Sequence, residues 1–165
     1  AAGLWSLGLG EPWPDVADAA LLDAFDLSGA RSRADLQRID VAAALRALLS
    51  WSLAARFDEV APERVVVASG SKVRIDYGDP AAPALPVRVQ EVFGWAGAPV
   101  AAGRPLRLHL LSPASRVVAV TSDLASFWVT GYPGVRADLR ARYPRHAWPE
   151  DPTAAPPSTR PSPRR

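Results

Sequence analysis

The chain has 165 residues, of which 48% are apolar and 22% are charged, proportions that are ordinary for a globular protein of one or two small domains. It contains no cysteine, which excludes disulfides, thiol catalysis and thiolate metal sites, and its two histidines leave little material for another kind of metal site. No apolar run approaches the roughly 18 residues that span a membrane, and the lack of cysteine suits a cytoplasmic location.

Charge is distributed unevenly along the chain. Residues 1–86 carry 8 basic and 12 acidic side chains, whereas residues 87–165 carry 11 basic and 5 acidic ones. A basic half is typical of proteins that bind polyanions, although the tail arginines, Arg164 and Arg165 among them, also contribute to it. The chain starts at Ala1 without a methionine, and we expect it to be a piece of a longer protein.

Residues 1–60 form the first predicted part, which is helical. A helix is expected from Asp15, and Asp40 has the side chain of an N-cap for a single helix over 41–57. Trp51 lies outside the apolar stripe of this helix and is expected to pack against a second layer. The stripe itself, which is expected to face the core, comprises Val41, Leu45, Leu48, Leu49 and Leu53.

Residues 61–121 form the second predicted part, which begins with a β-hairpin over 63–78. Ser69-Gly70 supplies its turn. Residues 79–86 are predicted to be a proline-rich connection, and the segment VRVQEVFGW, residues 87–95, to form a short helix that ends at Gly94. Alternation in the hairpin places Val73, Ile75 and Tyr77 on one face and Lys72, Arg74 and Asp76 on the other.

A second hairpin is predicted over 105–120, with Ser112-Pro113 opening its turn. The order of hairpin, helix and hairpin indicates an α+β fold, in which helices flank a small, mostly antiparallel sheet or a partial barrel. The alternating positions of the second hairpin are Leu106, Leu108 and Leu110 on one face and Arg107 and His109 on the other.

Residues 122–152 form the third predicted part, a helical extension. Thr121-Ser122 is expected to cap its first helix, Gly131 to end that helix, and Pro133 to begin the next one. The apolar positions are Leu124, Phe127 and Trp128 in the first helix and Val135, Leu139 and Tyr143 in the second.

The segment RYPRHAWPEDP, residues 142–152, is not expected to be helical, because Pro144 and Pro149 lack a backbone donor and favour extended conformations in the residues before them. It is also too aromatic for an ordinary disordered tail. It is therefore expected to be held against the protein or to bind a partner. Residues 153–165 are predicted to be a tail that is disordered at its end.

No group of residues indicates a catalytic, cofactor or metal site. The segment SGSK, residues 69–72, resembles a phosphate-binding loop only in part, because it lacks the first glycine and Val73 follows the lysine where Ser or Thr is needed. A hairpin turn is favoured. His109 has no second ligand at a suitable spacing and is expected at the surface.

Arg136 and Arg140 stand four residues apart on the last predicted helix. Like charges at this spacing cost a few tenths of a kcal/mol. The pair therefore indicates a site for phosphate, and a solvated arginine face is an equally good interpretation. Lys72 and Arg74 extend the same patch if the fold brings the two regions together.

Several blocks in a fixed order carry a resemblance to a known family. They are LQRIDVAAALRALLSW, SGSKVRIDYG, RVQEVFGW, LRLHLLSPASR and DLASFWVTGYPGVRADLRARYPRHAWPEDP. In this order they resemble the C-terminal region of the HrpB-type bacterial ATP-dependent RNA helicases, a branch of the DEAH-box family. The resemblance covers roughly Asp15 to Thr159 and is most specific from Leu106 to Pro152.

The resemblance implies a parent protein in which two RecA-like domains bind ATP and Mg²⁺ and hydrolyse the nucleotide, while an oligonucleotide-binding (OB) type barrel closes over RNA. The Walker lysine loop and the Asp-Glu-x-His box of that family are absent from this chain. The chain is therefore expected to be a non-catalytic C-terminal part that holds no cofactor, and any NTP hydrolase activity is expected of the parent. Its hairpin-helix-hairpin centre suits the OB-like barrel.

Two roles are open for residues 142–152. In the favoured one the segment is an extended proline-rich strap that lies across the domain with its aromatics in apolar slots, since prolines have less backbone entropy to lose. In the other, Tyr143, Trp148 and neighbouring arginines stack on RNA bases. Glu150 and Asp151 beside Trp148 argue against phosphate contact there.

The leading hypothesis for the whole chain is a helicase accessory region that binds single-stranded RNA and braces the RecA-like domains of the same parent. The alternative is a protein-protein interaction module that recruits a partner through a contiguous apolar patch. The residues predicted to contact the RNA backbone are Arg74, Arg88, Arg136, Arg140 and Arg145.

Overall fold

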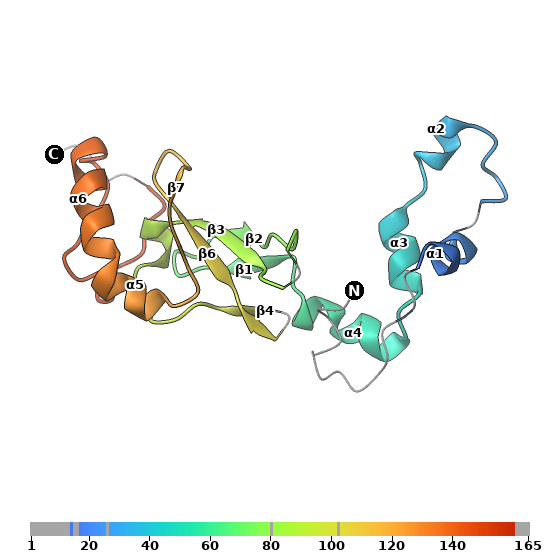
Figure 1. Ribbon diagram of the computed structural model, residues 1–165, viewed down its shortest axis with the longest axis horizontal. Helices are drawn as coiled ribbons and strands as arrows, with labels where there is room; N and C mark the ends of the chain where they lie inside the picture. The colour runs from blue at the N-terminus through green and yellow to red at the C-terminus, as the bar shows by residue number, and fades with distance from the viewer. Residues whose placement is uncertain (1–13, 15–16, 26, 80, 102, 161–165) are drawn as a thin grey trace. The chain divides into compact units, whose positions relative to one another are not determined.

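The computed structural model describes residue 14 and residues 17–25, 27–79, 81–101 and 103–160 (Figure 1). The chain divides into two compact units, Ala1–Ala61 (unit 1) and Pro62–Arg165 (unit 2). The predicted α+β class is confirmed, because unit 1 is helical and unit 2 combines small sheets with helices. The predicted boundaries after residues 121 and 152 fall inside unit 2.

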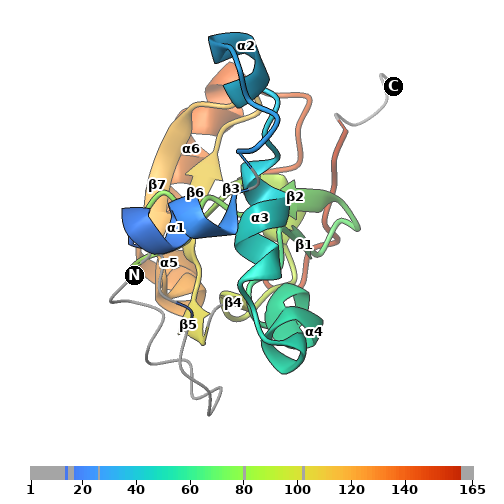
Figure 2. The same cartoon turned by 90° about the vertical axis from the view of Figure 1, so that its right-hand side faces the viewer.

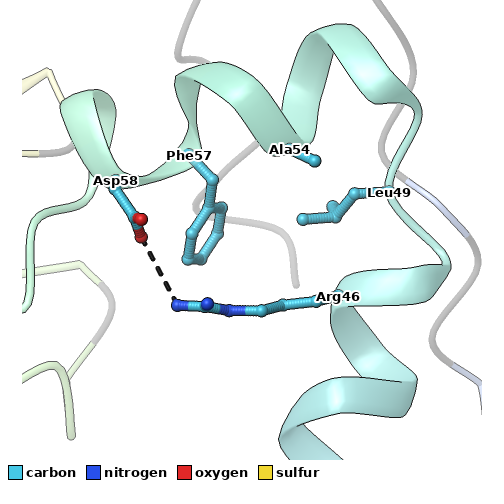
Figure 3. Close-up of a pocket in the computed structure, with 5 residues that line it drawn as sticks. All are labelled: Arg46, Leu49, Ala54, Phe57 and Asp58. Atoms are coloured by element: carbon cyan, nitrogen blue, oxygen red, sulfur yellow. Dashed lines mark hydrogen bonds and ion pairs between the residues drawn. The ribbon is translucent and has the colours of Figure 1, made fainter.

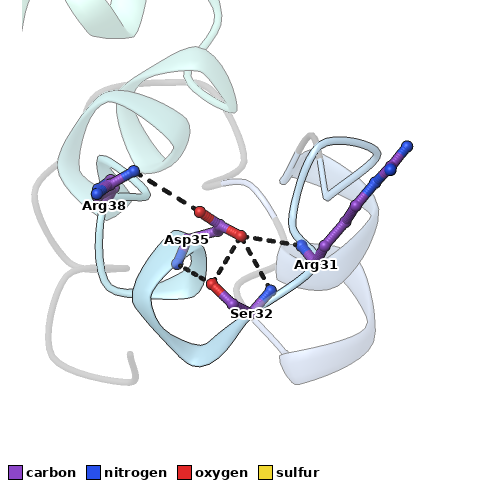
Figure 4. Close-up of polar contacts among 4 residues, drawn as sticks. All are labelled: Arg31, Ser32, Asp35 and Arg38. Atoms are coloured by element: carbon purple, nitrogen blue, oxygen red, sulfur yellow. Dashed lines mark hydrogen bonds and ion pairs between the residues drawn. The ribbon is translucent and has the colours of Figure 1, made fainter.

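The described residues of unit 1 form short helices: α1 (Asp18–Ala24), α2 (Arg33–Leu36), α3 (Val41–Ala47) and α4 (Trp51–Val60). A capping box begins α2: the Ser32 hydroxyl accepts the Asp35 N–H at 3.2 Å, and the Asp35 carboxylate accepts the Ser32 N–H at 2.9 Å (Figure 4). The Ser32 hydroxyl also donates to this carboxylate, and the bonds that the carboxylate accepts from this hydroxyl and from the Arg31 and Ser32 N–H groups lower the pKa of Asp35.

The predicted single helix over 41–57 is wrong. Asp40 caps α3 as expected, accepting the Ala43 N–H at 2.9 Å, but the helix ends at Ala47 and α4 begins after Ser50, whose hydroxyl accepts the Leu53 N–H at 3.3 Å. A serine that satisfies a free N–H in this way competes with continuation of the helix. The break divides the expected stripe between two helix directions.

The exposures in unit 1 follow from this break. Leu53 is buried, but Val41 is 51% exposed and Leu45 37%. Trp51 is 87% exposed, so its predicted packing against a second layer is also wrong. A small hollow between α3 and α4 is lined by Arg46, Leu49, Ala54, Phe57 and Asp58 (Figure 3). Across it, a guanidinium nitrogen of Arg46 lies 3.4 Å from a carboxylate oxygen of Asp58.

Unit 2 begins with the hairpin of β1 (Arg64–Val66) and β2 (Lys72–Arg74), which is confirmed. Gly70 takes a positive φ of 83° in the turn, a conformation that favours glycine. The two faces are as predicted: Val73, Ile75 and Tyr77 are buried or half-buried, and Lys72, Arg74 and Asp76 are exposed.

A three-stranded sheet in the order β3-β6-β7 follows (Figure 1). Its strands are β3 (Ala84–Arg88), β6 (Arg107–Leu111) and β7 (Val117–Thr121). β6 and β7 form the predicted second hairpin, and Leu106, Leu108 and Leu110 are completely buried. A smaller antiparallel pair joins β4 (Val100–Ala101) and β5 (Arg104–Pro105).

Two predictions about the region of β3 are wrong. Part of the predicted connection, residues 79–86, belongs to this strand, and β3 pairs with β6 in parallel rather than antiparallel. Pro86 obscures the strand in the sequence, but β3 is at one end of the strand order, where proline is tolerated. The short helix predicted over 87–95 is a 3-10 turn limited to Val89–Val92.

Helices α5 (Leu124–Thr130) and α6 (Tyr132–Arg142) carry the predicted apolar faces, with Gly131 between them. The N-cap of α5 is Asp123, which accepts the Ser126 N–H at 2.9 Å, and not the predicted Thr121-Ser122. The core of unit 2 joins the two helices to the sheet through a cluster of rings from Phe93, Phe127, Trp128 and Tyr132.

The segment after α6 is hydrogen-bonded to the rest of unit 2. Trp148 is only 8% exposed, and its indole N–H donates to the Tyr143 carbonyl at 2.9 Å. The Pro152 carbonyl accepts the Gly94 N–H at 3.0 Å, and the Ser158 N–H donates to the Gln90 carbonyl at 2.9 Å. Of the predicted tail, residues 161–165 lie outside the described residues.

Two glycines near the α5–α6 junction provide a test of this packing. A Cβ at Gly131 would lie 2.7 Å from a ring carbon of Phe127, whereas one at Gly134 would meet nothing within 4 Å. We therefore expect Gly131→Ala to destabilise unit 2 by about 1–3 kcal/mol, and Gly134→Ala to stabilise it by about 0.5 kcal/mol. Urea unfolding of both variants measures this, and a stabilising Gly131→Ala change contradicts it.

Candidate nucleic-acid interface

Positive charge is concentrated in unit 2. This unit carries 14 basic and 8 acidic residues, a formal net charge of +6, whereas unit 1 carries 5 basic and 9 acidic residues, a net charge of −4. The change of sign thus coincides with the boundary between two compact units. A basic unit and an acidic unit in one chain have the charge distribution expected when a single unit meets a polyanion.

The predicted pair on α6 is divided by its contacts. Arg136 is only 24% exposed: its Nε donates to the Trp148 carbonyl at 2.9 Å, and its guanidinium lies 3.1 Å from the Glu150 carboxylate. Arg140 is exposed and, among the described residues, has no carboxylate oxygen within 4.0 Å. Both arginines line one shallow groove with Ala137 and Ala141.

Arg74 lies on the exposed face of β2, as predicted. Its Nε is 3.6 Å from the Glu63 carboxylate, an exposed pair that is easily exchanged for another anion. Arg74 also lines an open hollow with Tyr77 and Pro86. The hydroxyl of Tyr77 donates to the Pro62 carbonyl at 2.9 Å, which fixes the ring beside the arginine.

Arg88 and Arg145 both act on His146. Arg88 is half-buried at the end of β3, Arg145 is exposed, and the half-buried His146 ring lies edge-on to Tyr143 with 6.2 Å between centroids. Burial lowers the pKa of the His146 imidazole, and the charges of Arg145 and Arg88 lower it further. Two predicted residues that are distant in sequence thus both act on the charge of His146, and we call Arg88, Arg145 and His146 the positive corner of unit 2.

The lowered pKa of His146 predicts a pH dependence of stability. The folded state resists protonation of this ring, so the contribution is fully present above about pH 6.5 and is lost as the pH falls through the lower folded-state pKa. We expect wild type to lose more stability than His146→Gln between about pH 7.5 and about pH 5.5. Urea unfolding at the two pH values measures this, and equal losses contradict it.

Trp148 offers no surface for a base to stack on, because it is buried and its N–H is bonded within the chain.

The SGSK segment forms the β1–β2 turn, and the structure shows no group of three potential metal ligands among the residues that it describes. Nor is any helix in the described part of the chain both long and apolar enough to cross a bilayer.

Arg104 and Arg107, which are not among the predicted RNA contacts, are exposed on β5 and β6. The alternation of β6 does place Arg107 on the outer face, opposite Leu106 and Leu108. Its neighbours depend on the strand register, which the sequence does not reveal.

Comparisons with known proteins define the class. A family profile described as ATP-dependent helicase C-terminal (HrpB_C) matches residues 24–152. The chain is 42% identical over 156 residues to the ATP-dependent RNA helicase HrpB of Escherichia coli (strain K12), covering 90% of this chain and 19% of that protein. The chain belongs to the HrpB_C family.

Solved structures agree with this assignment. A crystal structure of the E. coli DExH-box NTPase HrpB superposes with a TM-score of 0.82 at 39% identity, over 94% of this chain and 20% of that one. A crystal structure of the Escherichia coli DEAH/RHA helicase HrpB gives a TM-score of 0.64 at 36% identity, over 90% of this chain and 21% of that one. The chain therefore spans about a fifth of the length of these relatives.

Proposed function

We propose that this chain is the non-catalytic accessory region of an ATP-dependent RNA helicase and contributes contacts to the RNA backbone. The observation that carries the proposal is the concentration of charge, +6, in unit 2 of a helicase C-terminal region. The guanidinium group suits this role, because its planar set of donors matches phosphate oxygens. ATP and Mg²⁺ would bind in RecA-like domains that lie outside this chain, in a protein of the cytoplasm.

The five arginines predicted to contact RNA differ in their exposure and in the partners that they already have. Arg140 and Arg145 are exposed, and Arg88 shares a positive corner with Arg145, so these three suit backbone phosphates best. Arg74 can exchange its exposed carboxylate partner for phosphate. Arg136 is bonded to residues 148 and 150, which supports a role in holding the extended segment 143–152 as a strap.

The salt dependence of RNA binding tests the proposal. We expect the 165-residue chain to bind single-stranded RNA at low salt and the affinity to fall linearly in a plot of log K against log salt. Arg140→Gln and Arg145→Gln should each reduce the slope by ~0.7. Arg56→Gln, an exposed change in unit 1, is the control. Fluorescence anisotropy measures all four proteins, and a wild-type chain that fails to bind at low salt contradicts the proposal.

Unit 1 suits the second part of the proposed role, bracing the RecA-like domains. Trp51 is 87% exposed, and Leu22, Leu36 and Val41 are more than half exposed. Trp51 is the most exposed large apolar side chain among the described residues, and an open tryptophan is typical of a contact with protein. The same observation supports the alternative function, recruitment of another protein partner.

Binding to the ATPase region of the same parent distinguishes these two roles. If unit 1 braces it, the 165-residue chain should bind that region in trans, and Trp51→Ser should weaken binding while Arg140→Gln does not. Calorimetry measures the three affinities. Failure of the wild-type chain to bind contradicts bracing and leaves recruitment of another protein.

A further inference from the structure

A hollow at one end of the unit 2 sheet gathers residues that none of the foregoing roles uses. It is distinct from the α6 groove and from the positive corner at His146. Its lining residues are Ala81, Ala82, Arg104, Pro105, Arg107 and Ser122.

The strand register explains why these residues meet. β3 begins at Ala84 opposite Arg107 of β6, and the Arg107 N–H donates to the Pro83 carbonyl at 2.8 Å. On the other side of β6, Leu108 is paired with Thr121 at the end of β7. The next position along this antiparallel pair places Ser122 beside Arg107.

The two guanidinium groups are held toward solvent. Leu106 and Leu108 are completely buried, so Arg107 between them lies on the opposite face of its strand and is exposed. Arg104 donates through one terminal nitrogen to the Ala81 carbonyl at 3.4 Å. This bond uses one of five N–H donors and leaves the rest of the group for a ligand.

Neither guanidinium is neutralised within the part of the chain that the structure describes, because no carboxylate oxygen there lies within 4.0 Å of Arg104 or Arg107. The acids close to the hollow in sequence have other bonds. Asp79 accepts the Ala81 N–H at 3.0 Å, and Asp123 accepts the Ser126 N–H at 2.9 Å. Two unpaired cations beside one hydroxyl favour a ligand with several anionic oxygens.

We propose that this hollow is a subsite for one backbone phosphate of single-stranded RNA. Arg104 and Arg107 bind its non-bridging oxygens from two sides, and the Ser122 hydroxyl donates a further hydrogen bond. The small side chains of Ala81 and Ala82 let the sugar-phosphate chain approach closely. This assignment rests on the proposed function and locates one of its contacts.

RNA binding by the double variant R104Q/R107Q tests the subsite. We expect affinity for a labelled oligouridylate at low salt to fall about tenfold or more, and the salt slope to fall by ~1.4, or ~0.7 for each arginine. Ser122→Ala should cause a smaller loss. The matched control R116Q/R142Q removes two exposed arginines outside the hollow and should weaken binding less. If the two double variants bind RNA equally, the subsite is wrong while the proposed function stands.

Inorganic phosphate separates the subsite from the proposed function. We expect phosphate to shift the NMR signals of the Arg104 and Arg107 side chains in wild type, and to shift those of the control arginines, Arg116 and Arg142, by less. Shifts at these arginines in a chain that does not bind RNA would keep the anion site but overturn its assignment to RNA. If neither phosphate nor RNA perturbs them, the subsite is refuted.

Discussion

Replacing Tyr132 with alanine is expected to destabilise unit 2 by about 3–5 kcal/mol. The ring is 1% exposed and has its centroid 5.3 Å from that of Trp128 and 6.0 Å from that of Phe93. Its removal leaves a cavity where α6, α5 and the sheet meet, and such cavities close only in part. Denaturation by guanidinium chloride, followed by near-ultraviolet circular dichroism, measures the loss.

Tyr132→Phe separates the ring from its hydroxyl. The hydroxyl donates to the Pro149 carbonyl at 2.9 Å, and burial raises the pKa of Tyr132 to about 12, although the Arg136 charge lowers it, so the group remains a donor at neutral pH. Losing this one bond should cost about 1 kcal/mol. A Tyr132→Ala variant as stable as Tyr132→Phe contradicts the central position of the ring.

Replacing Arg136 with glutamine is expected to destabilise unit 2 by about 1–3 kcal/mol. The change removes the donor to the Trp148 carbonyl and the ion pair with Glu150. Because Glu150 is 88% exposed, its ion pair contributes little, and the bond to the carbonyl should account for most of the loss. Urea unfolding measures the difference from wild type.

Arg140→Gln is the matched control one turn along the same helix. It removes the same charge from an exposed side chain and should change stability by less than about 0.5 kcal/mol. Glu150→Gln should have an equally small effect. Equal destabilisation by Arg136→Gln and Arg140→Gln contradicts the assignment of Arg136 to the C-terminal segment.

The contrast between these arginines changes how the spacing on α6 is understood. Two arginines four residues apart indicated a phosphate site, but Arg136 has an internal reason to be present, because it is bonded to Trp148 and Glu150. For Arg140, the proposed contact with phosphate remains the interpretation. Arginine positions in this chain thus divide into those that fix the fold and those that remain open to a ligand.

Regular alternation made much of unit 2 predictable. Leu106, Leu108 and Leu110 recur with a period of two, and Gly70 fits a turn that needs a positive φ, so both hairpins are confirmed. β3 was missed because the prolines around it mask a strand whose partner, β6, is about twenty residues away.

Elsewhere the structure is determined by a single hydrogen bond or by contacts between residues that are distant in sequence, and neither leaves a local pattern. The Ser50 hydroxyl ends the helical run that the apolar pattern alone extends to residue 57. Of the predicted RNA contacts, Arg88 and Arg145 both act on the charge of His146 although they are far apart in sequence. The C-terminal segment packs against the residues that follow β3, where the Gly94 N–H donates to the Pro152 carbonyl and the Ser158 N–H to the Gln90 carbonyl. The hollow of Arg104 and Arg107 depends on strand register, which no local pattern encodes.

Hydrogen–deuterium exchange of the 165-residue chain with and without single-stranded RNA tests most directly whether unit 2 supplies the RNA contacts. We expect RNA at low salt to slow exchange in unit 2, around the hollow and the basic face of α6, and to leave unit 1 unchanged. Protection confined to unit 1, or no protection anywhere, would contradict the assignment of RNA binding to the basic unit.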